Sequence, residues 1–353
     1  MNSVPGRALP CPVTGKWRAV VVEGDAVESE QTIQVGSARM PAVGLGLWKI
    51  PESEAPATLA DAVAAGYRHL DSAADYGNEG AVGDGLRGIL ASGEVRREEL
   101  WITSKLWNTY HRPEHVRAAC ERSLGDLGVE YLDLYLMHFP IALKYVDFAD
   151  RYPPEWIHDP GAETPRMEPD AVPIAETWQA MEELVTAGLV REIGVCNFNS
   201  GLLHDLMATA QRKPAMLQIE SHPFLSQQRL LRLARDYDLS VTAFSPLGAL
   251  SYVELGMAEQ GESLLETPVV LSAAQRLGRT PAQVLLRWGL QRGTAIIPKT
   301  TRPERLRENI DLFGWSLTED EMTAISRLDC GRRFNDPGLF CEQAFGCFYP
   351  IYD

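Results

Sequence analysis

Three kinds of segment are missing from this sequence, and each absence excludes a class of protein. No run of about 18 apolar residues could form a membrane-spanning helix, and the N-terminal stretch MNSVPGRALPCPVTGKW lacks the apolar core of a signal peptide. No Lys/Arg-rich run interrupts the formal net charge of -15, so nothing attracts a phosphate backbone. We therefore expect a soluble, cytoplasmic protein with neither a membrane nor a nucleic acid as partner.

Cysteine is also scarce and scattered. The six cysteines are Cys11, Cys120, Cys196, Cys330, Cys341 and Cys347. They form no CxxC pair, which favours reduced thiols over a disulfide framework or a zinc site, with a local disulfide within the tail as a minor alternative. No His/Asp/Glu cluster of metal-binding type and no Ser or Cys nucleophile beside a base is evident, so we expect no metal.

What the chain does contain is a repeated alternation of short apolar runs and amphipathic segments. The eight runs that predict strands are AVGLGLW (42–48), YRHLD (67–71), LWITSKL (100–106), YLDLYLMHF (131–139), VREIGVCNF (190–198), AMLQIE (215–220), SVTAFSP (240–246) and TAIIPK (294–299). The segments between them, such as RPEHVRAACERSLGDLG (112–128), have helical spacing with Pro near the start and Gly near the end. Strands that are apolar along their whole length indicate a parallel sheet covered by helices.

This alternation predicts an α/β fold, a (β/α)8 TIM barrel. QTIQVGSARMP (31–41) alternates polar and apolar residues around a Gly-Ser turn, which predicts a β-hairpin capping the N-terminal end of the barrel. We expect a C-terminal tail over the active-site face. Residues 1–30 would form an N-terminal extension, and residues 31–353 a single barrel domain.

Four ionisable side chains follow the predicted strands. Asp71 and Tyr76 follow the second strand, Lys105 closes the third and His138 closes the fourth. Each alone has an ordinary explanation, such as a helix cap, a surface lysine or a buried core histidine. In a barrel, however, the C-terminal strand ends meet on one rim, and there the four form a chemical unit.

The unit suits protonation of an oxygen while a hydride reaches its carbon. A tyrosine is a poor acid at neutral pH unless a cation stabilises its phenolate, and Lys105 supplies that cation. Asp71 would hold the ammonium in place, and a neutral His138 would orient and polarise a substrate carbonyl. The hydride itself requires an organic donor.

These residues resemble the aldo-keto reductase superfamily from about residue 32 onwards. The stretches that carry the resemblance are YRHLDSAADYGNE, ITSKLW, LYLMHFP, GVCNF and IPKTTRPERLREN. Its catalytic tetrad matches Tyr76, Lys105, Asp71 and His138, with Tyr76 as the proton donor. Longer strings, among them TSKLWNTYH, MHFPIALKY, AQVLLRWGLQRG and RFNDP, look most like xylose reductases.

No GxGxxG follows a strand, so a Rossmann-type cofactor site is unsupported. Barrels bind phosphate in the loops after the last two strands, here FSPLGALSYVEL (244–255) and IPKTTRPERLREN (297–309). The resemblance places cofactor contacts at Cys196, Asn197, Gln218, Phe244, Ser245, Leu247, Gly248, Glu254, Lys299, Thr300, Thr301, Arg305, Glu308 and Asn309. Lys299, Thr300 and Arg305 would bind a 2′-phosphate, which predicts NADPH as the preferred cofactor. Glu254 would bind ribose hydroxyls, which makes NADH usable as well.

Two family positions differ in this sequence. Cysteine stands at 196 where the family usually has serine, and phenylalanine at 244 where a tyrosine stacks on the nicotinamide. A phenyl ring keeps the stacking face, whereas a thiol is a weaker hydrogen-bonding group than a hydroxyl. One contact to the nicotinamide carboxamide is therefore in doubt.

The predicted substrate residues are Trp48, Asp75, Trp107, Phe139 and Asn335. The aromatic residues would wall the pocket, while Asp75 and Asn335 match positions that contact sugar hydroxyls in xylose reductases. The long Pro-rich loop 151–173 is expected to act as a lid or a partner contact.

These features predict NAD(P)H-dependent reduction of an aldose, a xylose-like open-chain aldehyde, to its alditol. A sugar-phosphate reductase and a ketone or aldehyde reductase of secondary metabolism are the alternatives with the same tetrad. A non-catalytic nucleotide-binding regulatory subunit belongs to a different class, and the intact tetrad argues against it. The partner is a small carbonyl substrate, and the protein is expected to be a monomer or a homodimer.

Overall fold

A computed structural model describes residues 31–259 and 261–352 of the chain. It contains an antiparallel hairpin of β1 (Thr32–Val35) and β2 (Ala38–Pro41), followed by one eight-stranded parallel sheet. The eight strands are β3 (Leu45–Gly46), β4 (His69–Asp71), β5 (Trp101–Leu106), β6 (Leu132–Met137), β7 (Val190–Cys196), β8 (Met216–Glu220), β9 (Ser240–Phe244) and β10 (Ala295–Ile296). Each lies within one of the eight runs identified in the sequence, so the barrel prediction is confirmed.

The sheet closes on itself between its first and last strands. Its strands are ordered β10-β9-β8-β7-β6-β5-β4-β3. The Gly44 amide donates to the Ile296 carbonyl at 2.9 Å, and the Ile296 amide donates to the Ala42 carbonyl at 2.8 Å. A further bond from the Gly46 amide to the Pro298 carbonyl measures 3.1 Å. These bonds leave neither edge of the sheet open, although β3 and β10 are themselves only two residues long.

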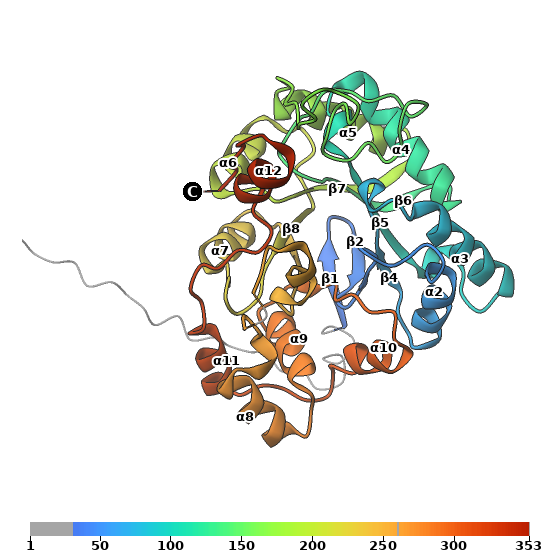
Figure 1. Cartoon of the computed structure of the whole chain (residues 1–353). Coiled ribbons are helices and arrows are strands. Elements are labelled where there is room, and N and C mark those ends of the chain that lie inside the picture. The colour runs from blue at the N-terminus through green and yellow to red at the C-terminus, as the bar shows by residue number, and fades with distance from the viewer. Residues whose placement is uncertain (1–30, 260, 353) are drawn as a thin grey trace, which may run out of the picture.

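Helices surround the sheet, as Figure 1 shows. They are α2 (Ala55–Ala64), α3 (Glu79–Ser92), α4 (Pro113–Leu127), α5 (Ile174–Thr186), α6 (Ser200–Thr209), α7 (Gln228–Asp236), α8 (Pro268–Leu277), α9 (Pro281–Gln291), α10 (Pro303–Ile310), α11 (Glu319–Ser326) and α12 (Pro337–Phe345). Helix α4 begins at Pro113, whose missing N–H costs nothing in the first turn, and ends at Gly128, whose φ is 67°. The Pro and Gly signals in the sequence therefore mark real helix boundaries.

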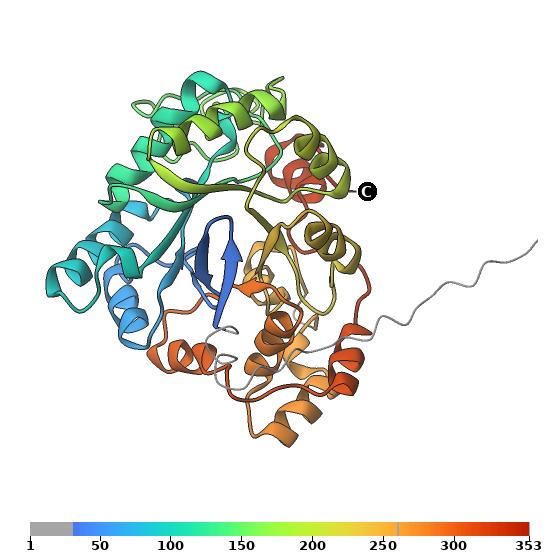
Figure 2. The same cartoon turned by 180° about the vertical axis from the view of Figure 1, so that it is seen from behind.

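The hairpin seals the N-terminal end of the barrel. Val35 and Met40 are fully buried and pack in one cluster with Trp101, Leu134 and Leu136 from β5 and β6. The Ser37 amide and hydroxyl both donate to the Glu192 carboxylate at 2.8 Å. Figure 2 shows the hairpin lying across the centre of the ring of strands, so the predicted cap is confirmed.

The C-terminal tail lies at the opposite end, where α12 covers part of the pocket described below. No helix of the described residues is long and apolar enough to cross a membrane. The five cysteines in the described part of the chain carry free thiols, whereas Cys11 and the extension proposed for residues 1–30 lie outside it. The division into an extension and one barrel domain stays a prediction.

Candidate active site

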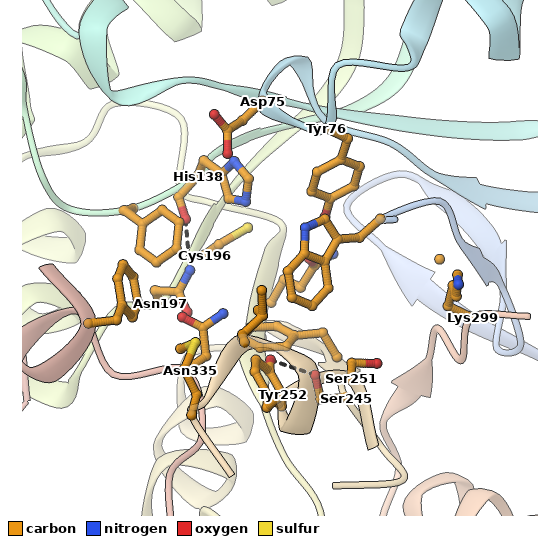
Figure 3. A pocket seen from close by; sticks show the side chains of 18 of the residues that line it. Asp75, Tyr76, His138, Cys196, Asn197, Ser245, Ser251, Tyr252, Lys299 and Asn335 are labelled. Atoms are coloured by element: carbon orange, nitrogen blue, oxygen red, sulfur yellow. Dashed lines mark hydrogen bonds between the residues drawn. The ribbon is translucent and has the colours of Figure 1, made fainter. Parts of the chain in front are cut away.

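A cavity of about 430 Å³ opens at the C-terminal end of the barrel strands. Of the predicted site residues, it is lined by Trp48, Asp71, Asp75, Tyr76, His138, Phe139, Cys196, Asn197, Gln218, Phe244, Ser245, Lys299 and Asn335. In Figure 3, Asp75, Tyr76 and His138 gather on one side of the cavity, and Ser245, Ser251 and Tyr252 lie on the opposite side. The structure thus brings together residues that are far apart in the sequence, at the end of the barrel that the fold predicts.

Lys105 contacts two of the other candidate catalytic residues, Asp71 and Tyr76. Its ammonium donates to Asp71 Oδ1 at 2.6 Å, to the Ser72 carbonyl at 2.7 Å and to the Tyr76 hydroxyl at 3.0 Å. Asp71 ends β4 and Lys105 lies within β5, both 1 % exposed, while Tyr76 ends the short 3-10 helix η1 (Ala74–Tyr76). Neighbouring parallel strands and one tight turn therefore fix all three groups.

Burial and the neighbouring charges together determine the protonation state of this unit. Burial raises the pKa of Tyr76 to about 12, and this outweighs the lowering caused by the Lys105 charge. The sequence argument expected Lys105 to make the phenol more acidic, and its effect has that sign but is smaller than that of burial. Burial lowers the pKa of Lys105, but Asp71 and Tyr76 more than offset this and leave it raised. At neutral pH, Tyr76 keeps its proton and Lys105 its charge.

His138 directly follows β6 and lines the same cavity. Its ring centroid lies 5.9 Å from that of Tyr76, with the two planes nearly perpendicular. Burial, followed by the charge of Lys105, lowers the pKa of His138 well below its ordinary value. The imidazole is therefore neutral, as a group that polarises a carbonyl by hydrogen bonding requires.

Two amide side chains extend the site from β7 and β8. Gln218 donates to Asp71 Oδ2 at 2.7 Å. Asn197 has a left-handed φ of 62°, and its side-chain nitrogen donates to the His138 carbonyl at 2.8 Å. Its neighbour Cys196 is 1 % exposed, and burial strongly raises the pKa of the thiol, so Cys196 stays protonated.

The loop after β9 forms the next part of the rim. Ser245 and Gly248 have positive φ values of 49° and 75°, and the Ser245 hydroxyl lies 2.8 Å from the Tyr252 hydroxyl. A Cβ at Gly248 would meet Leu264 Cδ1 at 2.8 Å, so glycine fits both the backbone and the space. Leu247 is half-buried in this loop, outside the lining of the cavity.

An ion pair bridges the rim. The Lys49 ammonium lies 2.6 Å from Glu254 Oε1 and 2.8 Å from the Ser251 carbonyl. It joins the end of the segment after β3 to the 3-10 helices η4 (Ala249–Ser251) and η5 (Val253–Leu255). Glu254 thus already has a cationic partner in addition to its predicted role at a ribose.

The predicted phosphate residues lie together after β10. Lys299 is exposed and lines the cavity, and Arg305 is exposed in the first turn of α10. Thr300 is buried and its hydroxyl accepts the Arg302 amide at 3.2 Å, with Thr301 beside it half-buried. Farther along α10, the Glu308 carboxylate accepts a hydrogen bond from Thr280, and Asn309 is buried. The segment therefore offers accessible cations next to a helix N-terminus, Lys299 and Arg305 among them.

One predicted pocket residue is placed differently. Trp107 is fully buried and its indole N–H donates to the Glu155 carbonyl at 3.0 Å. It lies behind the wall of the cavity, with its ring centroid 5.3 Å from that of His138 and 6.2 Å from that of Phe139. Trp107 is thus not among the residues that line the cavity; it supports His138 and Phe139, which do, and its contact with a substrate stays a prediction.

The comparisons with known proteins agree with this geometry. The model of the aldo/keto reductase family matches residues 32–329. The chain belongs to the aldo/keto reductase family.

Its relatives include the NAD(P)H-dependent D-xylose reductase xyl1 of Aspergillus niger, 48% identical over 89% of this chain and 96% of the relative. The probable NAD(P)H-dependent D-xylose reductase xyl1 of Arthroderma otae is also 48% identical, over 89% of this chain and 94% of its own. Among solved structures, the aldose reductase of Schistosoma japonicum matches with a TM-score of 0.78 and 38% identity. That match covers 90% of this chain and 96% of the other.

This aldo/keto reductase also has an aromatic wall that the sequence analysis missed. Trp156 from the long loop and Phe340 and Phe345 from α12 line the cavity. The rings of Trp156 and Phe345 are stacked at 5.7 Å, and Phe340 lies 5.2 Å from Trp156. These residues share no periodic pattern, so only the tertiary fold brings them together.

A second missed feature is a buried carboxylate that holds the tail. Glu220, at the end of β8, accepts the Phe334 amide at 2.8 Å and the Asn335 amide at 2.9 Å. His222 Nε2 lies 2.8 Å from the same carboxylate. The only signal for this carboxylate in the sequence is that Glu220 ends a predicted strand and His222 follows two residues later. Glu220 places Asn335 at the cavity.

Proposed function

We propose that this aldo/keto reductase reduces an open-chain aldose of the xylose type to its alditol, with NADPH preferred and NADH usable. The observation that carries the proposal is the buried Asp71–Lys105–Tyr76 unit facing a neutral His138 across one cavity. We further propose a cytoplasmic location and a monomeric or homodimeric state. Size-exclusion chromatography coupled to light scattering would test the latter.

The residues that line the cavity suit a nicotinamide cofactor in their chemistry. Asn197 and Gln218 offer amide groups at one end, and the exposed cation Lys299 lies apart from Asn197 in Figure 3. Phe244, which lies between Gln218 and Lys299 in the sequence, also lines the cavity and offers a flat apolar ring. The carboxamide would bind at Asn197 and Gln218, and a 2′-phosphate at Lys299, Thr300 and Arg305. A bound NAD(P)H supplies the hydride.

The residues of the chain supply the proton and the orientation. The Tyr76 phenol, protonated at neutral pH, donates its proton to the carbonyl oxygen as the hydride reaches the carbon. Lys105 stabilises the phenolate that is left, and Asp71 keeps the ammonium aligned. Neutral His138 would polarise the carbonyl by hydrogen bonding, and the surrounding aromatic rings exclude water.

Polar groups beyond the reacting carbon favour a hydroxylated substrate. Asp75 and Asn335 line the cavity, and Asn335 Oδ1 is buried without a partner among the described residues. Burial, followed by the neighbouring carboxylate of Glu155, raises the pKa of Asp75 well above its ordinary value. A protonated carboxyl can both donate to and accept from a sugar hydroxyl.

The decisive experiment is a spectrophotometric assay at the absorbance of the reduced nicotinamide. Purified protein would be tested with NADPH and NADH against aldoses, sugar phosphates and aromatic aldehydes. Turnover of xylose is expected. A wild type that reduces a sugar phosphate but no aldose would refute the substrate, and binding of NADPH without turnover of any carbonyl would indicate a nucleotide-binding subunit.

The aromatic wall favours a second candidate, reduction of an aromatic aldehyde. Trp156, Phe340 and Phe345 give the cavity an apolar side on which an aryl ring can pack. Asn335→Ala separates the two candidates, because it should lower kcat/KM for xylose more than for benzaldehyde. An equal loss for both substrates would favour the aromatic class.

A further inference from the structure

The end of the described chain contacts Asn197, one of the residues that line the active-site cavity. The Tyr352 hydroxyl lies 3.2 Å from the Asn197 carbonyl oxygen and 3.3 Å from Asn197 Oδ1. Both atoms are acceptors on one residue, so the single phenolic proton is shared between them. None of the sequence motifs pointed to this contact, which spans 155 residues.

Asn197 requires such support. Its φ of 62° is in the left-handed region, which costs free energy for a residue other than glycine. Its amide donates to the Gln218 carbonyl at 3.0 Å, and its Nδ2 donates to the His138 carbonyl at 2.8 Å. Within the described ranges, Asn197 Oδ1 accepts one hydrogen bond, the one from the Tyr352 hydroxyl. Tyr352 therefore completes the set of contacts that fixes this side chain.

Tyr352 is itself held on two sides. The Ile351 carbonyl accepts a hydrogen bond from Asn199 Nδ2 at 3.0 Å, which pins the tail to the start of α6. The Arg333 guanidinium carbon lies 3.5 Å from the centroid of the Tyr352 ring. Burial raises the pKa of the phenol, so it keeps the proton that it donates at neutral pH.

We propose that Tyr352 is a positioning residue for hydride transfer, because its hydroxyl orients Asn197 and, through Asn197, the carboxamide of the bound nicotinamide. This inference rests on the proposed function, which assigns the carboxamide contact to Asn197. Tyr352 touches neither substrate nor cofactor in this scheme. It acts at the nicotinamide end of the cavity and leaves the phosphate end unaffected.

Tyr352→Phe removes the hydroxyl but keeps an aromatic ring in contact with the Arg333 guanidinium. Tyr352 is half-buried and lines a second cavity between α6 and α7, so this change should leave the fold intact. Loss of one hydrogen bond and the resulting misorientation should slow hydride transfer about fivefold. The ratio of the Kd values for NADPH and NADH should not change, since the 2′-phosphate binds elsewhere.

The matched control is Tyr349→Phe. Tyr349 lies in the same tail, is also half-buried, and has no recorded hydrogen bond from its hydroxyl within the described residues. Single-turnover reduction would be followed with NADPH and with NADPH deuterated at C4. Tyr352→Phe should lower the hydride-transfer rate and increase the primary isotope effect on kcat, whereas Tyr349→Phe should match the wild type. An unchanged rate and isotope effect in Tyr352→Phe would overturn the proposal.

A double-mutant cycle with Asn197→Ala identifies the route of the effect. If Tyr352 acts through Asn197, the double variant is no slower than Asn197→Ala alone. Additive losses would overturn the inference, as would a wild-type rate in Asn197→Ala.

Nicotinamide fluorescence on NADPH binding tests the same cycle without turnover, and about threefold weaker binding by Tyr352→Phe is expected. If the wild type binds NADPH but reduces no carbonyl, the proposed function is wrong, but the positioning role of Tyr352 is not yet contradicted. In that case the double-mutant cycle measured by fluorescence tests the positioning role.

Discussion

At the scale of single residues, the Tyr76 hydroxyl is the proposed proton donor, so we expect catalysis to depend on it most directly. Tyr76→Phe removes the proton donor and leaves a ring of the same shape beside Lys105. We expect kcat/KM for an aldose to fall by at least about a hundredfold, the usual scale of general acid catalysis. Cofactor binding, measured by fluorescence titration, and the unfolding temperature should change little. Turnover near the wild-type rate would show that another group supplies the proton.

Asp75 makes stability depend on pH in a known direction. Burial and the nearby Glu155 raise its pKa well above the ordinary value, so the folded state holds the proton more tightly than the unfolded state. Its contribution to the free energy of unfolding is fully present below the unfolded pKa and is lost as pH rises towards the folded pKa.

Asp75→Asn removes this dependence because an amide does not titrate. Thermal unfolding of both proteins between about pH 4 and pH 8 should show the variant gaining stability relative to the wild type as pH rises. Groups common to both proteins cancel in the difference. A constant difference across this range would mean that Asp75 titrates normally.

The sequence predicts the positions of the ionisable residues of the site better than those of the aromatic residues around the cavity. Asp71, Lys105 and His138 could be placed because a parallel barrel brings its C-terminal strand ends together, whatever the loops do. The place of Trp107 behind the cavity wall could not be predicted from the sequence, for a physical reason. Both a pocket wall and a support behind it call for a large aromatic residue, and only the partner of its indole N–H, the Glu155 carbonyl, distinguishes them.

At the scale of elements, we expect the segment from β10 to α10 to determine the choice of cofactor. Lys299 and Arg305 present accessible positive charge there, in a protein whose formal net charge is -15. Lys299→Ala should therefore raise the Kd for NADPH about tenfold or more and leave that for NADH within about twofold, since only NADPH carries the additional phosphate. Isothermal titration of both cofactors measures this. Equal losses would place the phosphate elsewhere.

The elements that follow the barrel were the least predictable. Strand positions follow from apolar runs, and helix ends from Pro and Gly, because these are local signals. Helix α12 has the same end signals, Pro337 at its start and Gly346 with a φ of 61° just after its end, but no local signal predicts where it packs. It is placed by Glu220, which binds the two backbone amides before it, and by aromatic contacts to Trp156. Such contacts depend on segments more than 100 residues apart, as the 114-residue separation of Glu220 and Phe334 illustrates.

For the whole molecule, closure of the barrel depends on a glycine. A Cβ at Gly46 would lie 2.7 Å from the Ile297 carbonyl oxygen, so Gly46→Ala must separate the first strand from the last. We expect a loss of about 1 to 3 kcal/mol in the free energy of unfolding, measured by urea denaturation. Gly80→Ala is the control, since nothing lies within 4 Å of its Cβ and alanine favours the helix. Equal effects would mean that the strands separate without cost.

Closure between β3 and β10 also has a consequence for synthesis on the ribosome. A nascent chain that has emerged only as far as β9 has the strands of most of the barrel but no partner for β3, so both edges of its sheet remain unpaired. Unpaired strand edges make such a partly folded chain prone to aggregation, which chaperones prevent. Tyr352 and the aromatic residues of α12 emerge later still. The growing polypeptide therefore acquires Asp71, Tyr76, Lys105 and His138 early, whereas the lining of the cavity is complete only after the tail has left the exit tunnel.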